Sequence, residues 1–216
     1  MRKIFFLVCA ILLIAFESKS QDWIRIYGNN MIADVTWVIE TYDKGYLLLD
    51  NSHDYLWLVK TDVNGYKLWE KWIGTGTDAI RFGNIEETPD HGYILGGAFE
   101  KYNKNSYDPA IIKLNSCGEL DWCSVINTVG IYDFGMRAKP TPEGDFVLVA
   151  QGSVFIPGEN VQLFKFDNSG NLLWKNTYDP DSLIWSPEVH DVRVDDDGYL
   201  ISAKCCLLYT SDAADE

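Results

Sequence analysis

The sequence predicts an all-β fold built from a repeated unit of about fifty residues, a period typical of repeat architectures. One phrase runs from Lys through Asp or Asn and a glycine turn to Trp, and its tryptophans are 53 and 52 residues apart. A second phrase places Gly beside Tyr or Phe after a polar turn. The first phrase occurs at 60–69, 113–122 and 165–174, and the second at Gly45-Tyr46, Gly92-Tyr93, Gly144-Asp-Phe146 and Gly198-Tyr199. Strand-like repeats of this length indicate a β-propeller.

Each repeat is expected to form four short strands joined by tight turns. In the first repeat the strands are expected at 35–41, 46–49 and 56–60, followed by an outer strand that carries Trp69. Tight hairpins need a residue with positive φ, so the glycines of both turns are expected to fill that position. The tryptophan is expected to pack against the neighbouring sheet, because a single sheet cannot bury both of its faces.

These units define the predicted architecture. Residues 23–28 resemble the outer strand at 69–74, and we expect them to close the ring as the outer strand of a last blade. The fold class is therefore an all-β β-propeller of four-stranded antiparallel blades, with about three complete blades, a partial fourth and an N-terminal closing strand. The complete blades are expected at 34–73, 82–126 and 134–178, and the partial one at 188–204.

The N-terminus has the pattern of a secretory signal peptide at 1–20. A charged start and an apolar run at 4–16 precede Ser18 and Ser20, which suit a cleavage site. The apolar run is short for a membrane span, although an uncleaved anchor is the alternative.

The C-terminus departs from the repeat. Residues 206–216 resemble the translation of a sequencing adapter, so we expect the repeats to occupy 21–205 and the natural chain to continue beyond them. A natural acidic tail is the alternative.

The charge of the chain disfavours two classes of partner. The formal net charge is −14, and such a surface repels nucleic-acid phosphate and anionic lipid. It is typical of a soluble extracytoplasmic protein, or of one that binds cations or neutral sugars. We therefore expect a protein or carbohydrate ligand, no nucleic acid, no membrane span after signal removal, and a monomer at full length.

Two cysteines lie around one predicted hairpin. Cys117 falls in the turn and Cys123 follows the repeat tryptophan, so an oxidising compartment allows a disulfide between them. A metal pair is the alternative, but that repeat has no histidine, which disfavours zinc. No metal is expected.

The two phrases together resemble those of known proteins. The pattern Asp-x-x-Gly-x-x-x-Trp, as at 62–69, is similar to repeats of pyrroloquinoline-quinone-like propellers. The pattern Asp-x-Gly-Tyr-x-Leu, as at 43–48 and 90–95, resembles repeats of large secreted bacterial proteins, many of which carry a sorting domain for type IX secretion. The resemblance covers nearly all of 21–205 and implies a secreted bacterial propeller. The quinone-binding members imply a cofactor, but their site motif is not found in this sequence, so no cofactor is expected.

The variable connections are expected to carry any binding site. The hairpin turns are uniform, whereas the links between the second and third strands and between blades differ in length, and variable loops on a constant scaffold are usual sites of binding. We predict that loop aromatics form a platform for a sugar or peptide. The alternative is that they anchor the loops. These aromatics are Tyr102, Tyr107, Phe155 and Trp185.

No catalytic residue is assigned. The three histidines, His53, His91 and His190, are isolated in the sequence, and His53 and His91 are expected to lie in solvent. The acidic run at 195–197 occupies a predicted turn and lacks the ligand spacing of a calcium loop.

Adjacent carboxylates do not supply a hydrolytic pair either. Glu86 and Glu87 are consecutive on a predicted strand, so they are expected to point to opposite faces. The sequence therefore predicts a secreted, non-enzymatic propeller that acts as an extracytoplasmic binding or scaffold module. The alternatives are the propeller part of a carbohydrate-active hydrolase or of a quinone-dependent oxidoreductase.

Overall fold

The protein is described here by a computed structural model. It covers residues 24–28, 35–52, 55–74, 80–100, 107–127, 137–151, 161–178, 184–195 and 198–207, with the backbone alone at 52, 184–188 and 204–207. The predicted signal peptide, His53, Tyr102 and Phe155 lie outside the described residues. In the part of the chain that is described, the regular structure is entirely β-strand.

Fourteen strands form three four-stranded antiparallel sheets and a two-stranded hairpin, which confirms the all-β class. The strands of each sheet pair in sequence order, as expected for successive hairpins. The first sheet holds β1 (Val35–Glu40), β2 (Tyr46–Ser52), β3 (Tyr55–Thr61) and β4 (Lys67–Ile73). The second holds β5 (Ile80–Glu87), β6 (Tyr93–Glu100), β7 (Tyr107–Leu114) and β8 (Leu120–Val125). The third holds β9 (Arg137–Pro140), β10 (Phe146–Gln151), β11 (Val161–Phe166) and β12 (Leu172–Tyr178). The hairpin holds β13 (Ile184–Asp195) and β14 (Gly198–Leu207).

The three sheets fall where the sequence predicts its three complete units, and the hairpin falls on the predicted partial unit. The hairpin is longer than the expected 188–204, since it begins at Ile184 and ends at Leu207. Cys206 and Leu207, which the sequence pattern leaves outside the repeats, therefore lie in a strand.

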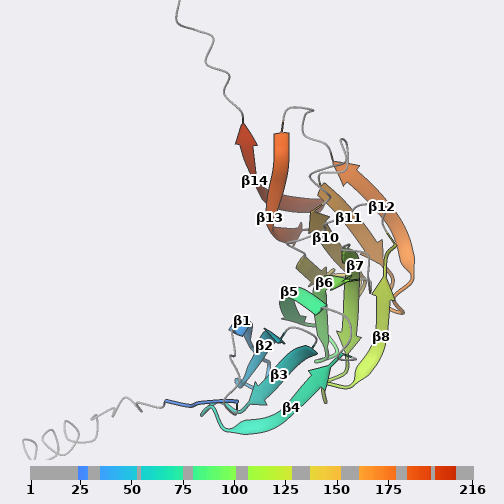
Figure 1. Ribbon diagram of the computed structural model, residues 1–216. Coiled ribbons are helices and arrows are strands. Elements are labelled where there is room, and N and C mark those ends of the chain that lie inside the picture. The colour runs from blue at the N-terminus through green and yellow to red at the C-terminus, as the bar shows by residue number, and fades with distance from the viewer. Residues whose placement is uncertain are drawn as a thin grey trace, which may run out of the picture.

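The sheets follow one another along an arc (Figure 1). In this view β4, β8 and β12 lie on the convex side, and β1 and β5 lie on the concave side. The first strands of successive units are in contact: β1 with β5, β5 with β9, and β9 with β13. The first sheet and the hairpin therefore stand at the two ends of the arc, and each sheet between them has a neighbour on both faces.

Three apolar clusters fill the spaces between successive sheets. The first contains Leu47 and Leu58 with Ile85 and Leu95, and it joins the first sheet to the second. The second cluster joins the second sheet to the third, and the third cluster joins the third sheet to the hairpin. Both faces of a middle sheet are thus apolar, as in β7, where all eight residues are buried. Removal of this surface from water is the main stabilising contribution to such a fold.

The repeat tryptophans lie on the outer strands and reach the next sheet, as predicted. Trp69 packs edge-on against Tyr93, with 6.4 Å between the ring centroids, and a Cβ at Gly118 would lie only 2.7 Å from its indole. The Trp122 indole is similarly close to Gly170, where a Cβ would lie 2.6 Å from it. Trp122 also donates its Nε1–H to the carbonyl of Asn168 at 3.2 Å. In the second and third sheets, glycine is needed in the turn between the third and fourth strands (the third turn) because the indole of the preceding sheet lies on it.

Amide side chains hold the first strands of the second and third sheets. Asn51 Nδ2 donates to Phe82 O and Asn51 Oδ1 accepts from Phe82 N, both at 2.8 Å. Asn84, which is fully buried, makes the same two bonds to Ala138 at 2.8 Å. Each amide thus imitates a strand neighbour and satisfies backbone groups that would otherwise be buried without a partner. We call these paired bonds amide clamps.

The two turn types use glycine for different reasons. In the third turns Gly65, Gly118 and Gly170 have φ between 74° and 82°, as predicted. In the first turns the prediction is wrong at Gly45 and Gly92, because the positive φ belongs to the preceding Lys44 (64°) and His91 (61°). A Cβ at Gly45 would strike the carbonyl oxygen of Thr61, so close approach explains this glycine.

We predict that Asn84→Ala lowers the free energy of unfolding by about 2–4 kcal/mol, because it leaves the N–H and C=O of Ala138 buried without partners. Chemical denaturation followed by tryptophan fluorescence measures this. Asn64→Ala, in an exposed turn, is the control and is expected to change stability by less than about 0.5 kcal/mol. Equal effects of the two substitutions would contradict the clamp.

Candidate functional site

In each complete sheet, the next-to-last residue of the third strand is a lysine whose side chain is turned inward to an acidic residue of the first turn, which joins the first and second strands. Lys60 Nζ lies 2.8 Å from Asp43 Oδ2, Lys113 Nζ lies 2.9 Å from Asp90 Oδ2, and Lys165 Nζ lies 3.3 Å from Asp145 Oδ2. The Lys60 side chain is only 4% exposed and also donates to the carbonyl of Thr61 at 3.0 Å. These pairs recur in three sheets and join parts of one sheet, which indicates a structural role.

The same contacts shift the pKa of two carboxyl groups. Burial by itself would raise the pKa of Asp43, but hydrogen bonds from Lys60, Thr41 and Gly45 outweigh it and hold the pKa at about 2. Thr88, Lys113 and Gly92 likewise hold the pKa of Asp90 at about 2 against the opposing effect of burial. Both groups are ionised at neutral pH, so neither is placed as a general acid.

Glu86 and Glu87 face different neighbours, which confirms that they cannot act on one substrate together. Glu86 pairs with Lys139 of the third sheet. Glu87 instead accepts from the backbone N of Tyr42 in the first sheet at 2.8 Å and lies 3.4 Å from His91 Nδ1. Each carboxylate therefore ties its sheet to a neighbour or to its own turn.

Two of the four predicted loop aromatics fall within the described residues. Tyr107 begins β7 and is only 7% exposed. Its hydroxyl accepts from Arg81 Nε at 3.2 Å and donates to Glu100 Oε2 at 3.1 Å. These contacts hold the ring at the start of β7, and the role of the loop aromatics in binding stays a prediction. Trp185 lies in β13 opposite Cys206, and its side chain is not among those described.

Both described histidines are exposed, as expected for His91. His91 stacks on Tyr42 with 3.9 Å between ring centroids, and His190 lies on β13. At the end of the same strand Asp195 lies 3.3 Å from Arg193 Nε, which gives this carboxylate a cationic partner. Residues 196–197 lie outside the described chain.

Cys117 and Cys123 are both free thiols in the structure, so the disulfide between them stays a prediction. Within the described ranges, no group of three or more His, Cys, Asp or Glu side chains could hold a metal ion. No helix in that part of the chain is long and apolar enough to cross a membrane.

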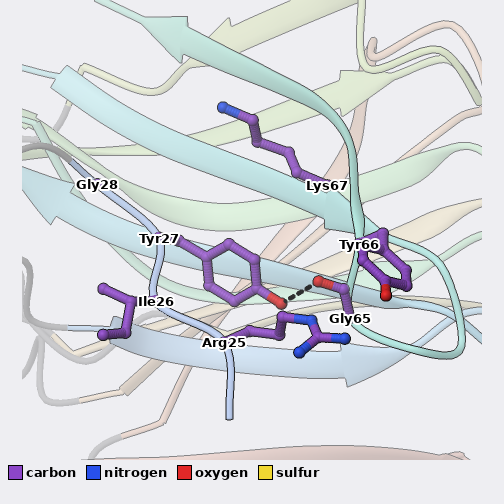
Figure 2. Close-up of a pocket in the computed structure, with 7 residues that line it drawn as sticks. All are labelled: Arg25, Ile26, Tyr27, Gly28, Gly65, Tyr66 and Lys67. Carbon is purple, nitrogen blue, oxygen red and sulfur yellow. Dashed lines mark hydrogen bonds between the residues drawn. The ribbon is translucent and has the colours of Figure 1, made fainter. Parts of the chain in front are cut away.

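The described chain has an open pocket of about 470 Å³ on the first sheet. Residues 25–28 form one wall, and residues 65–67, from the turn between β3 and β4, form the other. Figure 2 shows Tyr27 reaching across to this turn, where its hydroxyl donates to the carbonyl of Gly65 at 2.6 Å. Burial raises the pKa of Tyr27, so the phenol keeps its proton and remains a donor at neutral pH.

Arg25 is the charged group of the pocket wall. Its guanidinium lies over the Tyr66 ring, 4.5 Å from the centroid, and Nη1 donates to Ile24 O at 3.2 Å. Its Nε is shielded from solvent and makes no hydrogen bond with the described residues. Lys67 points away from Arg25 in Figure 2 and pairs with Glu70 at 2.7 Å, so Arg25 dominates the local charge.

The pocket therefore places a guanidinium, with its N–H donors, beside an aromatic ring, and Tyr66 is 61% exposed. Sequence reasoning missed these residues. The signal for residues 25–27 was their likeness to an outer strand, but nothing in the sequence indicates that they meet a turn about forty residues away.

Neither a protein-family model nor a curated protein sequence matches this chain. The chemistry of the pocket and the packing of the sheets therefore carry the functional argument.

We predict that the Asp43–Lys60 pair makes the free energy of unfolding decrease at acidic pH. Because the folded pKa of Asp43 is about 2, below its ordinary value of 3.8, the pair stabilises the fold at neutral pH and this contribution is lost as pH falls from about 4 to 2. Asp43→Asn should cost about 2 kcal/mol at pH 7, less than for a fully buried pair because Asp43 is 36% exposed.

The double variant Asp43→Asn with Lys60→Met should recover most of that loss, because no charge is then left buried. Its unfolding midpoint should also change less between pH 4 and pH 2 than that of the wild type. Glu70→Gln removes one side of an exposed pair and serves as the control. An unchanged acid profile in the double variant would contradict the assignment.

Proposed function

We propose that this chain belongs to a secreted propeller-type repeat protein that acts as an extracytoplasmic binding module, with the pocket on the first sheet as its site for a neutral carbohydrate. The observation that carries the ligand assignment is the Arg25 guanidinium lying over the exposed Tyr66 ring in an open pocket. Sugars present hydroxyl acceptors and apolar faces, which match such a donor and ring.

The propeller arrangement is supported by the repeated junction between sheets. Successive sheets pack face to face, their first strands follow one another, and tryptophans of outer strands contact the next sheet. Each of these features is expected of blades arranged about an axis. The pattern of residues 1–20 supports export.

The charge of the protein favours a neutral ligand over an acidic one. A net charge of −14 repels anions, and Arg25 is the one cation of the pocket wall that is not in an ion pair with a described residue. Binding of a neutral sugar should therefore be insensitive to salt, whereas binding of an acidic sugar should strengthen as salt screens the repulsion.

We predict that the exported protein binds a neutral oligosaccharide from a defined panel, measured by isothermal titration calorimetry. Arg25→Gln should weaken binding about tenfold, the effect of losing one hydrogen bond from a charged donor. Tyr66→Ala should weaken it by a similar factor, and Tyr178→Ala, which removes an exposed tyrosine from β12, should not. Affinities unchanged in both pocket variants would overturn the assignment of the site.

Export has its own test. The protein recovered outside the cytoplasm should begin at Gln21, as measured by mass spectrometry of its N-terminal peptide. A chain that keeps Met1 and remains in the cytoplasm would refute the extracytoplasmic part of the proposal.

A further inference from the structure

One position in each first strand faces the preceding sheet. It is identified from the pairing of the first and second strands. Counting from the aromatic residue at the start of the second strand, it lies opposite the third residue, as Val38 lies opposite Leu48. Three members of the series are fully buried and one is not. The series is Val38 (56% exposed), Ile85 (0%), Ala138 (0%) and Val192 (0%). The exposed member lies on the first sheet, which has no preceding sheet among the described residues.

One position in each second strand faces the following sheet. It directly follows the aromatic residue of the Gly-aromatic phrase, so it can be read from the sequence. Again three members are fully buried and one is exposed. The series is Leu47 (0%), Ile94 (0%), Val147 (0%) and Leu200 (68%). The exposed member lies on the hairpin, at the other end of the arc.

The two positions meet in every junction that the chain makes. Leu47 and Ile85 share the first cluster, Ile94 and Ala138 the second, and Val147 and Val192 the third. The residues left over are Leu200 and Val38. They are complementary halves of a fourth junction of the same kind, but within one chain they lie at opposite ends of the arc (Figure 1).

The uncovered face of the first sheet already carries part of a neighbour. Tyr27 of residues 24–28 donates to Gly65 O, as Ser124 of the outer strand β8 donates to Gly170 O. Gly28 lies against the Trp57 ring at the same edge. These residues therefore take the place of an outer strand, and the inner part of the face, around Val38, is left for inner strands. A hairpin of two inner strands is what the other end of the arc presents.

We propose that the uncovered face of the β13–β14 hairpin of one copy of this chain docks on the uncovered face of the first sheet of a second copy, so that Leu200 packs near Val38. The contact is heterologous, since it joins different surfaces of the two copies. It therefore builds either a closed ring or a chain of copies. Because each copy has a net charge of −14, added salt should strengthen the association.

Sedimentation velocity over a range of protein concentrations tests this. The 24.6 kDa chain should form species of two or more copies. Val38→Lys and Leu200→Lys each place a charge in the junction, and each variant alone should remain monomeric, with association at least tenfold weaker. Both residues are exposed in the single chain, so neither substitution disturbs its core.

An equimolar mixture of the two variants is the decisive sample. Each variant keeps one intact half, so the mixture can form one normal junction and should give a two-copy species and nothing larger. Val125→Lys and Leu120→Lys, at exposed positions of β8, are matched controls and should associate as the wild type does. A monomeric wild type, a mixture that stays monomeric, or single variants that associate normally would each overturn the proposal. A monomeric wild type would mean that something other than a second copy covers these faces.

Discussion

The junction between successive sheets is the constraint on which the rest of the structure depends. A four-stranded sheet with two apolar faces is not stable in water by itself, and β7 is buried along its whole length only because a sheet lies on each side of it. Each junction is held at several levels. An apolar cluster fills its interior, amide clamps hold the first strands in the first two junctions, and a tryptophan covers the outer edge.

This arrangement explains why strongly perturbed charged groups do not mark a catalytic centre here. A perturbed pKa is a signal of function only where the perturbed group faces a cleft or a reacting partner. Asp43 and Asp90 face lysines of their own sheets and close the first turn onto the third strand. The recurrence of the pair in three sheets makes it a part of the repeat. Chemistry particular to this protein is better sought where the repeat is broken, and residues 24–28 are such a place.

The sequence predicts the features of the fold that are local. The order of the strands, the third-turn glycines and the outer tryptophans each follow from a few consecutive residues and were predicted correctly, although β2 and the β13–β14 hairpin extend beyond their expected bounds. The clamps were not predictable, because Asn51 lies on β2 and Asn84 on β5, so their positions do not repeat. Gly45 was misread for a related reason. Its constraint comes from the carbonyl of Thr61, which reaches it only through the pairing of β2 with β3. The pocket depends on a contact between residues 27 and 65, which no local pattern reveals.

The pocket and the proposed docking surface lie on the same face of the first sheet but do not compete for it. The pocket is bounded by the turn between β3 and β4, toward the outer edge, whereas Val38 lies on β1, the first strand. In the junctions that the chain does make, inner strands pack on inner strands, and the outer strand alone reaches the third turn. A docked hairpin would therefore cover β1 and β2 and leave the pocket open. Ligand binding and association are then separable, so a substitution at Arg25 should leave assembly intact, and a substitution at Val38 should leave the pocket intact.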